Sequence, residues 1–83
     1  MKLLILTPDK QVFDGDITSV KVPGTNGQFE VLNGHAPIVS SLEGGVVRVI
    51  EAGGDRKEFS IEKGFIEVIN NEVAILAQGL ESA

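Results

Sequence analysis

The sequence predicts an all-β fold, a small antiparallel β-sandwich of about eight to ten short strands with no C-terminal helical domain. The first observation is composition, because 10 Val, 8 Ile and 4 Phe residues favour strands and 10 Gly residues favour turns. The second is spacing, because turn signals recur roughly every 8–12 residues and the segments between them alternate with period two. With 83 residues, the chain is expected to form one domain, residues 1–83.

The first part of the chain contains short apolar segments between turn signals. Residues 3–6 are apolar and end at Thr7-Pro8-Asp9, where Pro and Asp favour a turn. Residues 11–13 form a second short strand, which we expect to close in a hairpin turn at Asp14-Gly15-Asp16. Residues 17–22 alternate in polarity and predict a half-buried strand.

The second part of the chain predicts further strands at residues 38–42, 46–51, 57–62, 65–69 and 72–77. Ala52-Gly53-Gly54-Asp55 is expected to form a hairpin loop. Asn70-Asn71 is expected to form a two-residue type I′ turn, because Asn tolerates the left-handed conformation that this turn requires. Beyond the last strand, the sequence favours at most one helical turn, near residues 79–83.

Period-two alternation also predicts which side chains form the core. The expected core residues are Phe13, Val20, Val22, Phe29, Val31, Phe59, Ile61 and Phe65.

The stretch Pro23–Ile38, PGTNGQFEVLNGHAPI, organises the rest of the chain. Pro-Gly opens it, and Asn26-Gly27 offers positions that tolerate a positive φ in a tight turn. A second rigid loop follows at Asn33–Pro37. The apolar strand between the two loops contains Phe29, Val31 and Leu32. Gly and Pro residues that hold a surface in one shape favour recognition over catalysis.

The composition disfavours several classes of function. A net charge of −5 and a pI of about 4.6 argue against binding to nucleic acid or to an anionic membrane surface. No apolar run approaches the ~20 residues of a membrane span, so no direct membrane insertion is expected. The absence of Cys removes disulfides and thiolate metal sites. The absence of Trp and Tyr counts against sugar binding.

No set of residues in the sequence indicates catalysis. His35 is the only histidine, and the sequence has no G-x-S-x-G motif that would supply a nucleophile for it. Three roles remain open for His35: a structural one, in which the ring caps a turn or packs beside Pro37, an interface contact, and catalysis. The structural role is favoured, and it is compatible with an interface contact.

Two glycine-containing segments resemble ligand loops only in part. Gly24-Thr25-Asn26-Gly27 lacks the Lys-Ser/Thr pair of a phosphate-binding loop, and no helix follows it. Asp14-Gly15-Asp16 lacks the downstream carboxylates of a calcium loop. We therefore expect no catalytic residue, no metal ion and no cofactor.

Five blocks of the sequence carry a resemblance to a known family. They are LTPDKQVFDG at residues 6–15, SVKVPGTNGQF at 19–29, GHAP at 34–37, GFIEV at 64–68 and NEVAILA at 71–77. In order and spacing, they resemble the signature of the epsilon subunit of the F-type ATP synthase, which is called delta in mitochondria. The match covers almost the whole chain and lies in that subunit's N-terminal β-sandwich domain, and GHAP is its most specific block.

The resemblance implies a non-catalytic subunit of the central stalk that binds the gamma subunit, sits on the c-ring, turns with the rotor and helps couple proton flow to ATP synthesis. Such a subunit would be peripheral, on the cytoplasmic face of the bacterial inner membrane or the equivalent organelle membrane. Matched position by position, Gly27, Gln28 and Phe29 resemble the part that faces the c-ring. His35, Ala36, Pro37 and Ser40 resemble the part that faces gamma.

The chain departs from the family pattern at four positions. Glu30 stands where the family usually has Gly, which indicates that this strand position needs no positive φ. Asn33 stands where the family usually has Pro, which predicts a less rigid second loop. Lys63 and Gln78 replace a usual Gly and a usual Asp.

Two other classes of function compete with this interpretation. A free-standing β-sandwich binding module would be a monomer with a pocket for a small ligand or a peptide edge. A hydrolase would require a second catalytic partner for His35. A pull-down with purified gamma subunit discriminates these alternatives.

The chain is expected not to inhibit ATP hydrolysis through an extended C-terminal arm, which the family forms from a helical hairpin along gamma. Residues 77–83 would span only about 10 Å as a helix, and isolated helices that short are unstable in water. ATP binding by such a hairpin is likewise not expected. The measurement is ATP hydrolysis, uncoupled from proton flow, with and without the 83-residue chain. Strong, reversible inhibition by this chain would contradict the expectation.

Overall fold

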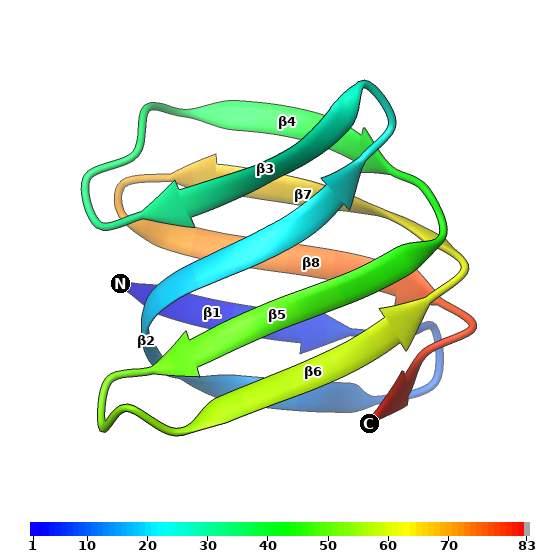
Figure 1. The fold of residues 1–83 in the computed structure, drawn as a ribbon, viewed down its shortest axis with the longest axis horizontal. Coiled ribbons are helices and arrows are strands. Elements are labelled where there is room, and N and C mark those ends of the chain that lie inside the picture. Colours follow the sequence, from blue (N-terminus) through cyan, green and yellow to red (C-terminus); the bar gives the residue numbers. More distant parts are fainter. Residues whose placement is uncertain (83) are drawn as a thin grey trace.

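The computed structural model describes residues 1–82, which form nine β-strands and no helix (Figure 1). The strands are β1 (Lys2–Leu6), β2 (Gln11–Gly24), β3 (Gly27–Leu32), β4 (Ile38–Leu42), β5 (Gly45–Glu51), β6 (Arg56–Ile61), β7 (Lys63–Ile69), β8 (Glu72–Gln78) and β9 (Glu81–Ser82). The expected all-β fold is confirmed. The helical turn expected near residues 79–83 is wrong for the described residues, because β9 pairs with β6 there, and residue 83 lies outside them.

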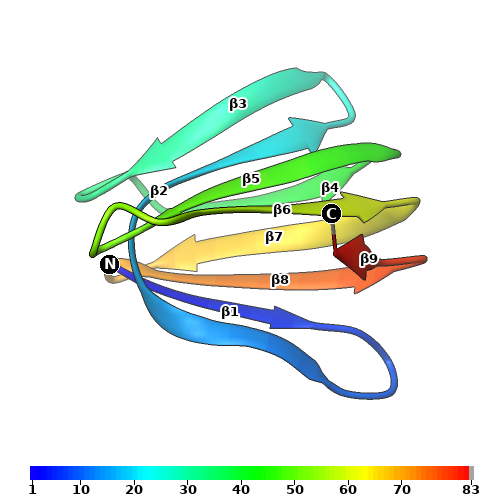
Figure 2. The same ribbon diagram turned by 60° about the horizontal axis from the view of Figure 1, so that its bottom comes forward.

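The strands form two layers that share one strand. The hydrogen-bonded order is β1-β8-β7-β4-β2-β5-β6-β9, with β3 beside β2 and a further pairing of β1 with β2. The first half of β2 pairs with β1, and its second half pairs with β3 and β5. Figure 2 shows β2 bending from the β1 layer up into the β3 and β5 layer. A single long strand therefore closes the sandwich along one side.

This long strand corrects the expected hairpin turn at Asp14-Gly15-Asp16. All three residues lie inside β2, where they pair with residues 2–4 of β1. Gly15 lies close to the Phe13 ring, since a Cβ at this position would be 3.4 Å from the ring. Gly15, which lies between the exposed Asp14 and Asp16, therefore leaves room for the Phe13 ring and does not end the strand.

The sheet is also not purely antiparallel. Strands β1 and β8 run parallel, with Lys2 opposite Glu72 and Leu6 opposite Leu76, whereas the other pairings are antiparallel. A parallel pair can join segments from opposite ends of the chain without a hairpin. No local sequence pattern indicates such a pairing, which explains why the expected antiparallel sandwich was incomplete.

The core between the layers contains most of the residues that alternation predicted. Six are buried as expected: Phe13, Val20, Val22, Val31, Phe59 and Ile61. The rings of Phe13 and Phe59 meet edge to face, with centroids 6.3 Å apart and an interplanar angle of 68°. This is a favourable arrangement for two aromatic rings.

Two of the predicted core residues lie elsewhere. Phe29 is only partly buried and packs against the edge of the core. Phe65 is 59% exposed, so its prediction as a core residue is wrong. Along β7, Ile66 and Val68 are the buried positions, and Phe65 alternates with them onto the outer face.

The turn residues behave largely as predicted. Asn70 and Asn71 have φ values of 51° and 63°, which confirms the left-handed turn between β7 and β8. In the turn between β2 and β3, Gly27 takes a positive φ of 123°, but Asn26 does not. The expectation of two such positions was therefore correct only for Gly27.

A matched pair of Phe variants should separate core from surface. Phe59→Ala removes a buried ring and is expected to lower the free energy of unfolding by about 3–5 kcal/mol. Phe65→Ala removes an exposed ring and should change it by less than about 1 kcal/mol. Urea unfolding of both variants measures the difference, and equal destabilisation would contradict the assigned register.

A second pair tests the close approach of β7 to β8. A Cβ at Gly64 would lie 2.4 Å from the Leu76 carbonyl oxygen, so Gly64→Ala is expected to cost about 1–3 kcal/mol of stability. Gly53→Ala is the control, because a Cβ at Gly53 meets nothing within 4 Å. Its thermal midpoint should stay unchanged or rise slightly. A Gly64→Ala variant that melts like the control would show that these strands are farther apart.

Candidate partner-binding surfaces

The turn between β2 and β3 carries the residues that the sequence assigned to the c-ring side. Gly24 pairs with Gly27 across the turn. A Cβ at Gly24 would lie 2.7 Å from the Gly27 oxygen and 2.8 Å from the Phe29 ring. Only a glycine lets the chain turn here with that ring lying against it. Gly27 and Gln28 are exposed at the start of β3, so Gln28 is the assigned residue that offers a side chain to a partner.

Hydrogen bonds to β4 hold this turn in place. The Thr25 N–H donates to the Ser41 carbonyl over 3.1 Å, and the two hydroxyl oxygens lie 2.9 Å apart. The Glu43 N–H donates to the Pro23 carbonyl over 2.8 Å. The turn is therefore tied to a strand of the other layer as well as to its own hairpin.

The loop between β3 and β4, residues 33–37, carries three of the four residues assigned to the gamma side. Gly34 has a φ of 82°, and the His35 N–H donates to the Leu32 carbonyl over 3.0 Å. Nδ1 of His35 lies 2.6 Å from the Ala36 carbonyl oxygen. Because a carbonyl only accepts, Nδ1 carries the proton, and Nε2 takes no part in this bond. The ring thus helps to fold its own loop, as the structural interpretation of His35 expects.

The loop is further held by a residue from another hairpin. The Gly34 N–H donates to Oδ1 of Asn71 over 2.8 Å, and Nδ2 of Asn71 donates to Oδ1 of Asn33 over 2.6 Å. Asn33 was expected to make the loop less rigid because it replaces Pro. The hydrogen bond from Asn71 instead gives Asn33 a fixed partner.

The predicted residues fall into separate groups. Ala36 and Pro37 are exposed beside His35 in the loop. Ser40 lies apart from them on β4, partly buried and opposite the buried Ile66. Figure 1 shows the β2–β3 turn and the β3–β4 loop at opposite ends of β3. The c-ring and gamma assignments therefore occupy two ends of one hairpin.

The sequence reasoning missed a third feature, the outer apolar face of β4, β7 and β8. Its apolar side chains are Val39, Phe65, Ile69 and Leu76, which are 72%, 59%, 51% and 47% exposed. Two exposed carboxylates lie on the same face, Glu67 opposite Val39 and Glu72 opposite Ile69. Phe65 lies opposite Leu76 on the neighbouring strand. These two side chains line a hollow of about 340 Å³ together with Ser41 and Leu42.

This outer apolar face is continuous with the β3–β4 loop. Pro37 lines a shallow hollow of about 240 Å³ together with Val39 and Ile69. The signal that could have revealed the face is that some outward positions of β7 and β8, Phe65, Ile69 and Leu76, are apolar although their neighbours on the same face, such as Glu67 and Gln78, are polar. Apolar residues at outward positions are typical of strands covered on both faces.

The opposite outer face, on β3, β2, β5 and β6, is charged. In the register of neighbouring strands, Glu30 lies opposite Lys21, Lys21 lies opposite Arg48, and Arg48 lies opposite Glu58. Nε of Arg48 lies 3.1 Å from a Glu58 carboxylate oxygen on this face. The Lys57–Glu51 pair, 3.4 Å apart, lies on the other side of the same strands, where Lys57 is opposite the buried Val49. Exposed pairs of this kind stabilise a fold by no more than about 1 kcal/mol. This face is suited to water and contrasts with the apolar face.

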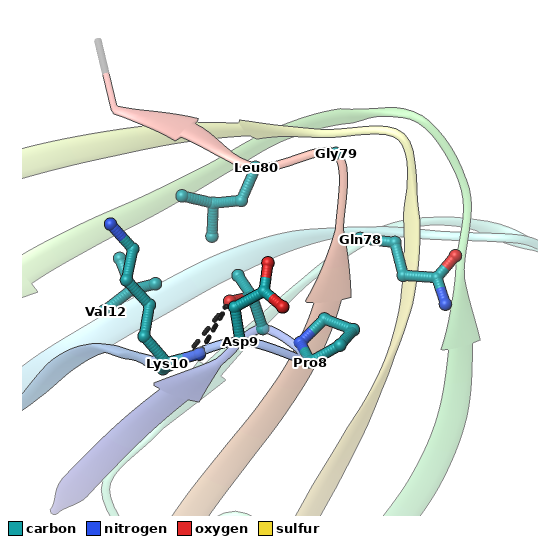
Figure 3. A pocket seen from close by; sticks show the side chains of 8 residues that line it. Pro8, Asp9, Lys10, Val12, Gln78, Gly79 and Leu80 are labelled. Atoms are coloured by element: carbon teal, nitrogen blue, oxygen red, sulfur yellow. Dashed lines mark hydrogen bonds between the residues drawn. The ribbon is translucent and has the colours of Figure 1, made fainter.

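A further hollow of about 530 Å³ lies at the end of β8 (Figure 3). Its lining residues are Thr7, Pro8, Asp9, Lys10, Val12, Gln78, Gly79 and Leu80. None of the predicted site residues is among them. Two of the lining residues are hydrogen-bonded to each other, since the Lys10 N–H donates to Oγ1 of Thr7 over 3.2 Å. The Thr7 hydroxyl in this hollow donates to the Lys10 carbonyl over 3.3 Å and not to the Asp9 carboxylate, so it is not paired with a base.

Nothing in residues 1–82 forms a metal site or a catalytic set of the kinds considered. The described residues contain no group of three or more His, Asp or Glu side chains placed to hold a metal ion. The His35 ring bonds a backbone carbonyl and not a hydroxyl or a carboxylate. Over the same residues, no helix is long and apolar enough to cross a membrane.

Comparison with known proteins agrees with the fold. The family model described as the ATP synthase delta/epsilon chain, beta-sandwich domain, matches residues 1–83. The ATP synthase epsilon chain of Prochloron didemni is 43% identical over 81 residues, which cover 98% of this chain and 59% of that protein. This chain therefore spans well under two thirds of that relative's length.

Two solved structures share the fold. A chain of the Euglena gracilis mitochondrial ATP synthase, in an assembly of OSCP, F1 and c-ring, matches with a TM-score of 0.87 and 23% identity, over 96% of this chain and 51% of that one. A chain of the central stalk and c-ring of the Tetrahymena thermophila mitochondrial ATP synthase matches with a TM-score of 0.80 and 19% identity, over 98% and 65%. Together with the full-length family match, these similarities show that the chain belongs to the family of ATP synthase delta/epsilon chain β-sandwich domains.

Proposed function

We propose that this chain is a non-catalytic central-stalk subunit of a proton-translocating F-type ATP synthase, which binds the gamma subunit and the c-ring and helps couple proton flow to ATP synthesis. Two findings support this proposal. The chain belongs to the delta/epsilon family, and the solved chains with a similar fold come from ATP synthase assemblies that contain a c-ring. In this role the chain is a peripheral component on the cytoplasmic face of the bacterial inner membrane, or on the equivalent organelle membrane.

The outer apolar face is the observation that carries the proposal. Monomeric soluble proteins rarely leave several large apolar side chains together in water, and such patches usually mark an interface. Here Val39, Phe65, Ile69 and Leu76 do so on one face, with Glu67 and Glu72 beside them, while the opposite face is mostly charged and exposes one large apolar side chain, Leu32. A face of this kind fits a partner with an apolar surface of its own, which we assign to gamma.

The β3–β4 loop extends this surface at one end. Pro37 adjoins Val39 and Ile69, so the loop and the apolar face meet one partner together. His35 contributes by holding the loop and by leaving Nε2 for a hydrogen bond to gamma. Ser40 lies on the inner side of β4, so it supports this surface more than it forms it.

The β2–β3 turn fits the second partner. Gly27 and Gln28 are exposed at the end of β3 that lies away from the β3–β4 loop (Figure 1). Phe29 anchors the turn against the core. A c-ring contact at Gln28 and a gamma contact at the other end place both partners on one rigid body, which can transmit force between them.

The enzyme alternative has no support in the geometry of His35, and the hollow at the end of β8 supplies no catalytic pair. We therefore assign no chemistry and no cofactor to this chain. A free-standing binding module remains the outcome if neither gamma nor the c-ring binds.

The gamma assignment predicts that Phe65→Ala weakens binding to purified gamma without unfolding the chain. Loss of a large apolar contact is expected to reduce the affinity by about 10- to 100-fold. Arg56→Ala, on the charged face, is the control and should bind like the wild type. Isothermal titration measures the affinity of both variants for gamma. Equal affinities would show that gamma does not bind the outer apolar face.

The two-surface assignment predicts different defects for the partly buried His35 and the exposed Gln28. His35→Ala should weaken binding to gamma, whereas Gln28→Ala should weaken assembly onto the c-ring and leave gamma binding intact. Both variants should keep the wild-type circular dichroism spectrum, since neither side chain belongs to the core. Wild-type assembly by both variants would show that the partners bind elsewhere.

A further inference from the structure

The side chain of Asn71 connects two hairpins that are far apart in the sequence. Asn71 lies in the β7–β8 turn, whereas its hydrogen-bond partners Asn33 and Gly34 open the β3–β4 loop, 38 and 37 residues earlier. Figure 1 shows this loop beside the β7–β8 turn. The contact is therefore a product of the fold and not of the local sequence.

The geometry leaves one orientation for the Asn71 amide. The Gly34 N–H is a donor, so the atom 2.8 Å from it must be the amide oxygen. The amide nitrogen then points to Oδ1 of Asn33, 2.6 Å away, to which it donates. Both hydrogen-bonding groups of this side chain are thus used on two consecutive residues, and together they fix the start of the loop.

The backbone of Asn71 is hydrogen-bonded to the sheet. Its carbonyl accepts a hydrogen bond from the Lys2 N–H over 3.3 Å, at the start of β1. The preceding strand β7 carries Phe65 and Ile69 of the outer apolar face. Asn71 is therefore hydrogen-bonded both to the loop and to the sheet that carries that face.

We propose that Asn71 is a positioning residue, which holds residues 33–37 in the conformation that binds the gamma subunit. This inference rests on the proposed function, because it assigns the loop and the outer apolar face to one partner. A surface made of two segments binds well only if their spacing is set before binding, since otherwise association must also order the loop. Asn71 sets the spacing from outside the loop, without itself being part of the exposed surface of residues 35–37.

Asn70 supplies a matched control in the same turn. Both residues have positive φ values, 51° for Asn70 and 63° for Asn71, so a glycine is tolerated at either position. The Asn70 side chain is exposed, whereas the Asn71 side chain is partly buried against the loop. Asn70→Gly and Asn71→Gly therefore make the same backbone change, but only the second removes the two hydrogen bonds to the loop.

The first measurement is amide hydrogen exchange in the free chain, followed by NMR. Asn71→Gly is expected to speed exchange of the Gly34 N–H by about 3- to 10-fold, as for the loss of one hydrogen bond, whereas Asn70→Gly should leave it unchanged. Asn71→Asp keeps an acceptor for Gly34 and should keep its protection within about twofold. Equal Gly34 exchange in the wild type and Asn71→Gly would overturn the inference.

The second measurement is the affinity of each variant for purified gamma subunit. Asn71→Gly is expected to bind about 3- to 10-fold more weakly than Asn70→Gly, in step with the lost order of the loop. Faster Gly34 exchange with affinities equal for the two variants would overturn the positioning role. Absence of gamma binding by the wild-type chain would instead refute the proposed function, and the exchange measurement would still report on the hydrogen bonds of Asn71.

Discussion

The continuity of β2 through both layers is the constraint on which the rest of the structure depends. This strand pairs with β1, β3, β4 and β5, so it belongs to both layers and connects them. Because it bends, the Phe13 ring near its start meets the Phe59 ring of β6 in the core. A real turn at Asp14-Gly15-Asp16 would detach the two layers and leave β1 without a partner on that side.

The closed sandwich leaves two outer faces, and these have different chemistry. The face of β5 and β6 carries Arg48 paired with Glu58, which water solvates well. The face of β7 and β8 carries Phe65 opposite Leu76, which water solvates poorly. The fold does not require this asymmetry, since the core is complete without either outer face. Stability of the core therefore does not explain the asymmetry, whereas the proposed binding of gamma would.

The parts of the fold that follow from local pattern were predictable. Asn70-Asn71 forms the left-handed turn, and Phe59 with Ile61 faces inward, because turn chemistry and period-two alternation act over a few residues. The parallel pairing of β1 with β8 joins opposite ends of the chain, and no local signal contains it. For the same reason the hydrogen bonds from Asn71 to the β3–β4 loop, which complete one candidate surface, could not be read from the sequence.

Phe65 shows why the site was harder to predict than the core. Alternation states that Phe65 and Ile66 face opposite ways, but it does not state which face is covered, since both side chains are apolar. The structure covers Ile66 with the second layer and leaves Phe65 in water. The buried face of β7 and β8 therefore stabilises the fold, and their exposed face carries the side chains that we propose for binding gamma. Phe65→Ala is therefore expected to cost little stability, whereas Ile66→Ala would leave a cavity in the core.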